Sequence, residues 1–117
     1  FVKGVVIRRA QLGRKMGFPT ANIDAHGIEQ IENGVYYSQV CLDGHLYNAM
    51  SNIGTRPSVD GRSRLLETHI FGFEGDLYGK TLEVDLKQKI RDERRFTSLD
   101  ELQQQLEKDA ALCNPAI

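Results

Sequence analysis

The stretch 35-VYYSQVCLDGHLYNAMSNI-53 decides the fold more than any other part of the chain. Valine and tyrosine gather on the N-terminal side of Asp43-Gly44, and β-branched and aromatic residues favour strands. Asp-Gly between two such runs is typical of a two-residue hairpin turn, because both turn positions need positive φ. The stretch therefore predicts two antiparallel strands, one over residues 35–42 and the other from about 46 to 53.

Strand signals continue on both sides of this hairpin. They fall in residues 1–8, 20–23, 65–73 and 82–87. In the last segment Leu82, Val84 and Leu86 alternate with charged side chains, as in a strand with one buried and one solvated face. Residues 54–64 contain Pro57 and an Asp-Gly pair among small polar residues, so we expect a mobile loop there.

One helix is predicted near the end of the chain. Ser98 and Glu101 have the spacing of a capping box, in which each side chain binds the backbone N–H of the other residue. The apolar stripe of this helix is Leu99, Leu102, Leu106, Ala110 and Cys113, and Asn114-Pro115 ends it. Six strands with short connections and one terminal helix favour a mainly β fold, a closed or nearly closed six-stranded antiparallel barrel of Greek-key type with a C-terminal α-helix.

The composition is that of one globular domain spanning residues 1–117, with 40% hydrophobic and 26% charged residues. The formal net charge is -1, so we expect neither nucleic acid nor an anionic membrane as a partner. A local basic patch at Arg8, Arg9, Arg14 and Lys15 leaves RNA binding open. No apolar run reaches the length of a transmembrane helix.

Two further features concern cellular location and the natural length of the protein. Cys41 and Cys113 lack metal-ligand spacing, and no signal peptide opens the chain. Both observations indicate thiols in a reducing compartment and hence a cytoplasmic location. Because the chain begins at Phe1 and not at methionine, we expect a domain excised from a longer protein.

Residues 13–22, GRKMGFPTAN, combine glycines, cations and small polar side chains. Gly13 and Gly17 let backbone N–H groups approach a ligand, while Arg14 and Lys15 add positive charge. Such a loop suits an anion, most simply a phosphate. An ordinary Gly/Pro-rich turn with surface charges explains the same residues equally well.

Pro19 directs the chain into the predicted strand at 20–23, where Thr20 and Asn22 share one face. Their hydroxyl and amide oxygens are hard ligands of the kind that hold Mg²⁺ beside phosphates. The spacing differs from the GxxxxGK[ST] phosphate loop, since a proline replaces the lysine and a strand replaces the helix. We therefore expect phosphate and Mg²⁺ contacts from this pair.

Glu67 is the carboxylate that best fits a general base. It lies in the predicted strand 65–73 with Phe71 and Phe73 on the same face, and partly apolar surroundings raise the proton affinity of a carboxylate. The alternative is an outward-facing residue without a chemical role. His69 shares this face and could tune Glu67 or bind metal, although a packed, hydrogen-bonded histidine is the commoner case.

Several short motifs follow one another along the chain in the order expected of a known family. They are Gly13-Arg14, GFPTAN at 17–22, Asn52-Ile-Gly54, Arg56-Pro57-Ser58, Glu67, Leu77-Tyr-Gly79, Ile90-Arg91 and Phe96. Together they resemble the riboflavin kinase family over essentially the whole chain. The resemblance implies a six-stranded barrel that uses ATP and Mg²⁺ to phosphorylate the 5′-hydroxyl of riboflavin, giving FMN and ADP. In bacteria this domain is commonly the C-terminal half of a bifunctional riboflavin kinase and FMN adenylyltransferase (FAD synthetase), which implies a covalently linked adenylyltransferase domain.

The resemblance also implies roles for single residues. On the nucleotide side these are Gly13, Arg14, Gly17, Pro19, Thr20 and Asn22, of which the last two would also contact Mg²⁺. Glu67 would take the proton of the riboflavin hydroxyl, and Arg91 and Phe96 would lie by the flavin. Asn52 matches the motif without an assigned role.

Closure of residues 9–19 and 54–64 over the substrates is expected, because it would exclude water from phosphoryl transfer. Two other classes of function compete with a kinase. One is a barrel that binds FMN or a nucleotide without turning it over. The other is a small RNA-binding barrel, which the net charge and the lack of an aromatic and basic strand pattern disfavour.

Overall fold

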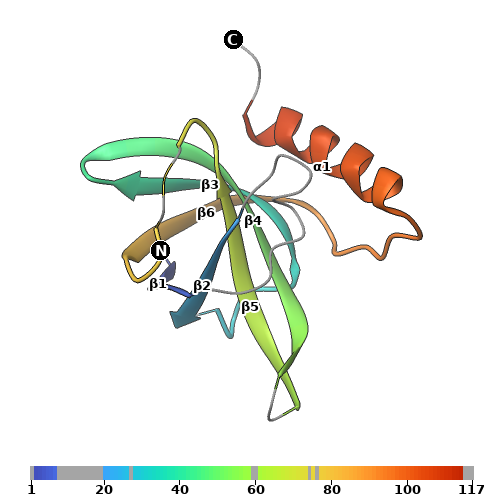
Figure 1. The fold of residues 1–117 in the computed structure, drawn as a ribbon, viewed down its shortest axis with the longest axis horizontal. Helices are drawn as coiled ribbons and strands as arrows, with labels where there is room; N and C mark the ends of the chain where they lie inside the picture. The colour runs from blue at the N-terminus through green and yellow to red at the C-terminus, as the bar shows by residue number, and fades with distance from the viewer. Residues whose placement is uncertain are drawn as a thin grey trace.

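The computed structural model describes residues 2–7, 20–26, 28–58, 61–73, 75 and 77–114. These residues form β1 (Val2–Ile7), β2 (Ala21–His26), β3 (Gly34–Leu42), β4 (His45–Ser58), β5 (Gly61–Ile70), β6 (Thr81–Arg91) and α1 (Leu99–Cys113). The strands close into a barrel in the order β1-β2-β5-β4-β3-β6, with every neighbouring pair antiparallel (Figure 1). This confirms the predicted six-stranded antiparallel barrel with a C-terminal helix.

The central hairpin agrees with its sequence signal. β3 pairs with β4 from Leu42 opposite His45 to Gly34 opposite Ile53. At the turn, Asp43 and Gly44 have φ values of 51° and 81°. Positive φ at both positions matches a hairpin turn whose twist agrees with that of the strands.

The prediction of a loop at residues 54–64 is wrong, because β4 and β5 continue their pairing to Ser58 opposite Gly61. Figure 1 shows this hairpin projecting beyond the rest of the barrel. Past Ile53, β5 is the one strand paired with β4 among the described residues, since β3 begins at Gly34 opposite Ile53. A proline is tolerated where one side of a strand has no neighbour, so Pro57 does not end β4.

Inside the barrel, neighbouring strands bring large apolar side chains together. Ile23, Leu66 and Ile53 are direct cross-strand partners and are all almost fully buried. The alternation predicted for β5 is confirmed from Leu66 to Ile70, since Leu66 and Thr68 are buried and Glu67 lies on the opposite face. The strand ends at Ile70, sooner than expected, in a turn.

Three buried hydroxyls interrupt this apolar interior. The Ser38 and Ser51 Oγ atoms are 2.7 Å apart, and the Ser51 Oγ is 2.9 Å from the Thr68 Oγ1. Each hydroxyl can both donate and accept a hydrogen bond, so the chain of three satisfies its own members. We call these three residues the hydroxyl chain.

α1 covers one part of the outer surface of the barrel (Figure 1). The Ser98 side chain accepts from the Glu101 N–H at 3.1 Å, which confirms half of the capping box. The Glu101 carboxylate accepts instead from Arg94 and Thr97. Leu99 was expected in the apolar stripe but is 61% exposed, so the helix meets the barrel through its later turns.

Among those later turns, Cys113 is fully buried beside Val35 and Met50. Burial is the main cause that raises the pKa of the Cys113 thiol to about 11, with a smaller contribution from the carboxylate of Asp109. The thiol therefore stays protonated and packs against its apolar neighbours. No helix within the described residues has the length and apolarity to cross a membrane.

Candidate active site

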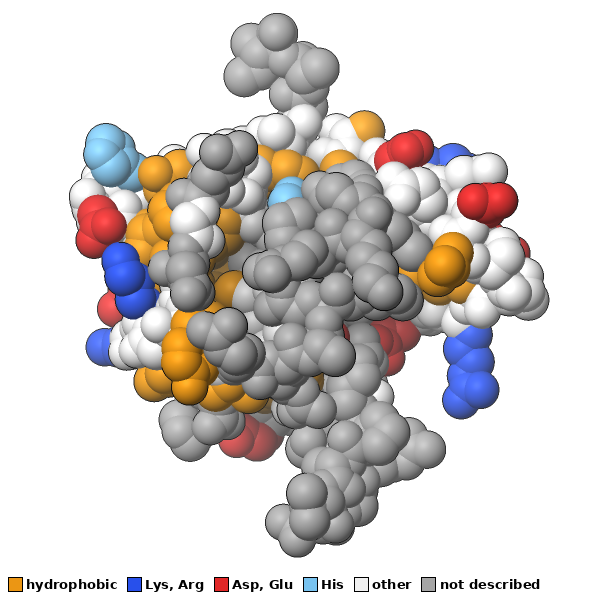
Figure 2. Space-filling view, in the orientation of Figure 1, with side chains coloured by type: hydrophobic (Ala, Val, Ile, Leu, Met, Phe, Trp, Pro, Cys, Tyr) orange, Lys and Arg blue, Asp and Glu red, His pale blue; other side chains and the backbone are white. Residues whose placement is uncertain are grey.

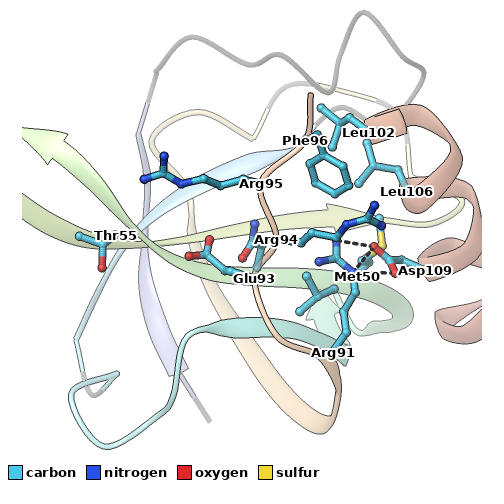
Figure 3. Close-up of a pocket in the computed structure, with 12 residues that line it drawn as sticks. Met50, Thr55, Arg91, Glu93, Arg94, Arg95, Phe96, Leu102, Leu106 and Asp109 are labelled. Carbon is cyan, nitrogen blue, oxygen red and sulfur yellow. Dashed lines mark hydrogen bonds and ion pairs between the residues drawn. The ribbon is translucent and has the colours of Figure 1, made fainter. Parts of the chain in front are cut away.

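A pocket of about 570 Å³ lies between α1, residues 91–96 and the outer face of β3 and β4 (Figure 3). Val35, Met50, Asn52 and Thr55 line it from the barrel. The volume falls within the usual range for sites that bind small molecules, roughly 300 to 1,000 Å³. The pocket forms because α1 returns over the barrel after the extended segment that follows β6.

Apolar side chains line this pocket on both sides, among polar and charged ones. Val35 and Met50 belong to the barrel side, and both are buried. On the helix side Phe96 lies beside Leu102 and Leu106 (Figure 3). An aromatic ring with aliphatic neighbours on one side and buried aliphatic groups on the other suits a flat, apolar ligand.

An ion pair ties the helix to the barrel at this pocket. The Arg91 Nε lies 3.0 Å from both carboxylate oxygens of Asp109, and the Arg91 Nη2 donates to Asp109 Oδ2 at 2.8 Å. Asp109 is 1% exposed and also accepts from the Gln105 side chain at 2.9 Å. The carboxylate is therefore fully engaged, and the pair fixes the distance between α1 and the end of β6.

Cations surround the aromatic ring of the pocket. The guanidinium carbons of Arg94 and Arg91 lie 5.0 and 6.0 Å from the centre of the Phe96 ring. Arg94 is itself held by the Glu101 carboxylate at 3.0 Å. These contacts hold Phe96 in place and bring charged groups to the edge of the apolar side chains.

A row of directly paired residues leads out of the pocket across five strands. Arg91 pairs with Val35, Val35 with Asn52, Asn52 with Glu67 and Glu67 with Asn22. Direct partners in antiparallel strands lie on the same face, here the outer one, because the next row contains the core residues. We call these five residues the site row.

The site row begins in the pocket and continues to polar side chains outside it. Arg91, Val35 and Asn52 line the pocket. Neighbouring strands lie about 4.8 Å apart, so Glu67 is one strand beyond the edge of the pocket and Asn22 is one strand further. A ligand that fills the pocket and extends past Asn52 therefore reaches the Glu67 carboxylate first and Asn22 next.

Two amides in the site row carry buried atoms without hydrogen-bond partners. They are the Asn22 Nδ2 and the Asn52 Oδ1. A buried polar atom left unpaired costs about 1 to 3 kcal/mol, so native proteins keep few of them. Their position on either side of Glu67 points to a polar ligand that would complete them.

A divalent metal would find hard oxygen ligands at one end of the site row. Asn22 is 1% exposed and offers an amide oxygen, while Thr20, two residues earlier, is half-buried. No cluster of three or more His, Cys, Asp or Glu side chains suited to a metal occurs within the described part of the chain. These residues fit Mg²⁺, which keeps several waters and is commonly held by few protein oxygens together with substrate phosphates.

The residues proposed from the sequence come together to different extents. The structure joins Asn22, Glu67 and Asn52 in one row and brings Arg91 and Phe96 to one pocket. His69 lies two residues along β5, with its ring against Phe71 at 4.8 Å between centroids. Gly13, Arg14, Gly17 and Pro19 lie outside the described residues, and so does the predicted closure of residues 9–19.

Asp109 and the apolar pocket residues other than Phe96 were not foreseen as part of the site. The signal for Asp109 is present in the sequence, because it occurs between Leu106 and Cys113 at a spacing that places it on the buried side of α1. Val35 and Met50 carry no such signal, since an apolar residue in a strand is the common case.

The chain matches the protein-family model of the riboflavin kinases (flavokinases) over residues 1–116. A bifunctional riboflavin kinase/FMN adenylyltransferase of Haemophilus influenzae is 45% identical over 91% of the chain. The corresponding protein of Escherichia coli K12 is 42% identical over 92% of the chain, as is an RNA-binding riboflavin kinase, RibR, of Bacillus subtilis. The chain spans 35% of the first two relatives and 47% of the third.

Among solved structures, one described as a macrolide-efflux protein from Streptococcus pneumoniae has the same fold. Its TM-score is 0.87 at 33% sequence identity, and the match covers 98% of this chain and 38% of that one. The likeness therefore extends over both the barrel and the helix.

Proposed function

The chain belongs to the riboflavin kinase family, and we propose that it transfers the γ-phosphate of ATP to the 5′-hydroxyl of riboflavin, giving FMN and ADP. The observation that carries this proposal is the site row. It runs from an apolar pocket suited to a flat ring system, past a carboxylate, to a buried amide. That order matches a substrate with an aromatic ring at one end and a reacting hydroxyl at the other.

The isoalloxazine ring occupies the pocket under α1, between Phe96 on the helix side and Val35 and Met50 on the barrel side. Arg91 acts mainly through Asp109, because its guanidinium is committed to that carboxylate at 2.8 to 3.0 Å. It is therefore a positioning residue that keeps the pocket open at the width of a flat ring. Phe96 touches the ring directly.

Glu67 is the general base for the reaction. Its carboxylate takes the proton of the 5′-hydroxyl while that oxygen forms a bond to the γ-phosphorus, and the bond between the phosphorus and the bridging oxygen of ADP breaks. The proton ends on Glu67 and the electron pair of the broken bond ends on ADP. The extended riboflavin chain brings its terminal hydroxyl to Glu67 because Glu67 is one strand beyond the pocket.

Thr20 and Asn22 hold the nucleotide side of the site. The unpaired Asn22 Nδ2 is a donor suited to a phosphate oxygen. Mg²⁺ bound by the Thr20 and Asn22 oxygens would offset negative charge on the phosphates. Gly13, Arg14, Gly17 and Pro19 cover the ATP phosphates in this proposal, which rests for these four on their motif alone.

In the full-length protein we place a covalently linked FMN adenylyltransferase domain before this kinase domain of residues 1–117. Relatives that carry both activities in their names support this arrangement. We place the enzyme in the cytoplasm, where ATP is available and where free thiols such as Cys41 and Cys113 persist. RNA is not among its proposed partners, although one relative is named for RNA binding.

The test is to incubate the protein with riboflavin, ATP and Mg²⁺ and to follow FMN by chromatography. FMN and ADP should form in equal amounts, and omission of Mg²⁺ should abolish both. Tight riboflavin binding without FMN formation would overturn the proposal in favour of a barrel that binds flavin without turning it over. Glu67→Gln serves as the matched inactive control.

A further inference from the structure

Asn52 marks the boundary between the pocket and the reacting end of the site row. Its side chain lines the pocket, while its direct partner on β5 is Glu67. Other amides nearby are engaged: the Asn48 Oδ1, on the same strand and face, accepts from the Tyr37 hydroxyl at 2.9 Å. The Asn52 Oδ1 is buried and has no partner.

A buried carbonyl oxygen without a donor is destabilising, and an apolar side chain of similar size would remove that cost. The missing partner must be a donor that arrives from the pocket side and lies about one strand spacing from Glu67. Water fits poorly as the intended partner, because an apolar ligand that fills the pocket would displace it. A hydroxyl of the ligand fits well, since it both donates and accepts and so suits either end of the amide.

We propose that Asn52 recognises an inner hydroxyl of the substrate's polyol chain and thereby selects polyol flavins over flavins with a plain alkyl alcohol. The inference rests on the proposed function and names a specificity-determining residue for it. When Asn52 binds this inner hydroxyl, the polyol chain is held so that its terminal hydroxyl contacts the Glu67 carboxylate. Asn52 touches the substrate and takes no proton.

The experiment compares two acceptors, riboflavin and a flavin whose N10 substituent is a 5-hydroxypentyl chain, which keeps only the terminal hydroxyl. kcat/KM is measured for both in the wild type, Asn52→Ala and Asn52→Leu. The preference for riboflavin should fall about 10- to 100-fold in both variants, while kcat/KM for the hydroxypentyl flavin stays near the wild-type value. An unchanged preference in both variants would overturn the inference.

Asn48→Ala is the matched control, because it removes an amide from the same strand and face outside the pocket. It should lower the melting temperature, through loss of its bonds to Tyr37 and Asn114, and leave the preference unchanged. Asn52→Leu should melt at or above the wild-type temperature, because it removes an unpaired buried oxygen. A marked fall in melting temperature for Asn52→Leu would indicate a purely structural amide and would count against the inference.

Failure of the proposed function is distinguishable from failure of this inference. If the wild type makes no phosphorylated product, the kinase proposal fails. Dissociation constants for the two flavins, from quenching of flavin fluorescence, still test Asn52 on the same variants. Equal loss of preference in Asn52→Ala and Asn48→Ala would overturn the assignment to Asn52.

Discussion

Buried polar side chains differ in their hydrogen bonding between the inner and the outer face of the barrel strands β2, β5, β4 and β3. Inside the barrel, Ser38, Ser51 and Thr68 satisfy one another within 2.9 Å. On the outer face, Asn22 and Asn52 each keep a buried atom without a partner. The two faces share strands and backbone hydrogen bonds, so the difference lies in the side chains alone. The paired hydroxyls serve the fold, and the unpaired amide atoms belong to the part of the surface where we propose that the ligand binds.

The largest effect that this comparison predicts is at Glu67, between the two unpaired amides. Glu67→Gln should lower kcat by about 10²- to 10⁴-fold, because the amide cannot take the proton of the hydroxyl. Riboflavin binding, followed by flavin fluorescence, and the melting temperature should stay near the wild-type values. Near-normal turnover would remove Glu67 from the mechanism.

Asn22→Leu tests the end of the site row that we propose to bind the nucleotide. Turnover should fall by about 10²-fold, and the Mg²⁺ titration should shift to higher concentration, because an oxygen ligand and a donor are both lost. The free protein should be as stable as the wild type or more so, since an unpaired Nδ2 is removed. An unchanged Mg²⁺ titration would contradict the ligand assignment.

Arg91→Met tests whether paired polar groups stabilise the fold on the outer face too, because the Arg91–Asp109 ion pair is a fully paired polar group on that face. If pairing marks a role in the fold on either face, the variant should lose stability by about 3 kcal/mol, since it leaves the Asp109 carboxylate buried without its cation. KM for riboflavin should rise more than kcat falls. Urea unfolding measures the first effect and steady-state kinetics the second.

A double variant provides the control for that experiment. Arg91→Met with Asp109→Leu removes both charges and should recover part of the lost stability. If the single variant were as stable as the wild type, the ion pair would have no part in holding α1 on the barrel.

The smallest effect is expected from the hydroxyl chain. Ser51→Ala removes its central member and leaves Ser38 and Thr68 without that partner, which should cost about 1 to 3 kcal/mol of unfolding free energy. kcat and KM should be those of the wild type, because the change faces the interior. A loss of activity without a loss of stability would show that the two faces are not separate in function.

Much of the fold follows from local signals in the sequence. Asp43-Gly44 sets the turn and register of the central hairpin, and Ser98 sets the start of α1. Pro57 and Asp60-Gly61 misled the prediction, since local turn signals say nothing of a neighbouring strand. The β4–β5 pairing continues there, and Pro57 is tolerated because the described pairing of β4 with β3 stops at Ile53.

The sequence named residues of the proposed site but did not predict how they are arranged. Asn22, Glu67 and Asn52 were named from motifs, but their alignment depends on the register of β2, β5 and β4, which periodicity does not give. Arg91 and Phe96 were expected by the flavin, but the other apolar residues of the pocket under α1 were not foreseen, because sequence patterns assign them to an ordinary core. Asp109 was missed for a similar reason, because it lies among the apolar residues of the helix stripe.

The closed barrel also governs when the site can exist during folding. Neighbours in the ring include β1 with β6 and β2 with β5, pairs that are distant along the chain. Such non-local pairings form slowly, on the order of milliseconds to seconds in all-β domains, because loop-closure entropy is lost before the contacts form. The site row needs both the β2–β5 and the β3–β6 pairings. Phosphorylation of riboflavin by a refolding chain, which needs the whole site row, should therefore report these two non-local pairings and not the formation of any single hairpin.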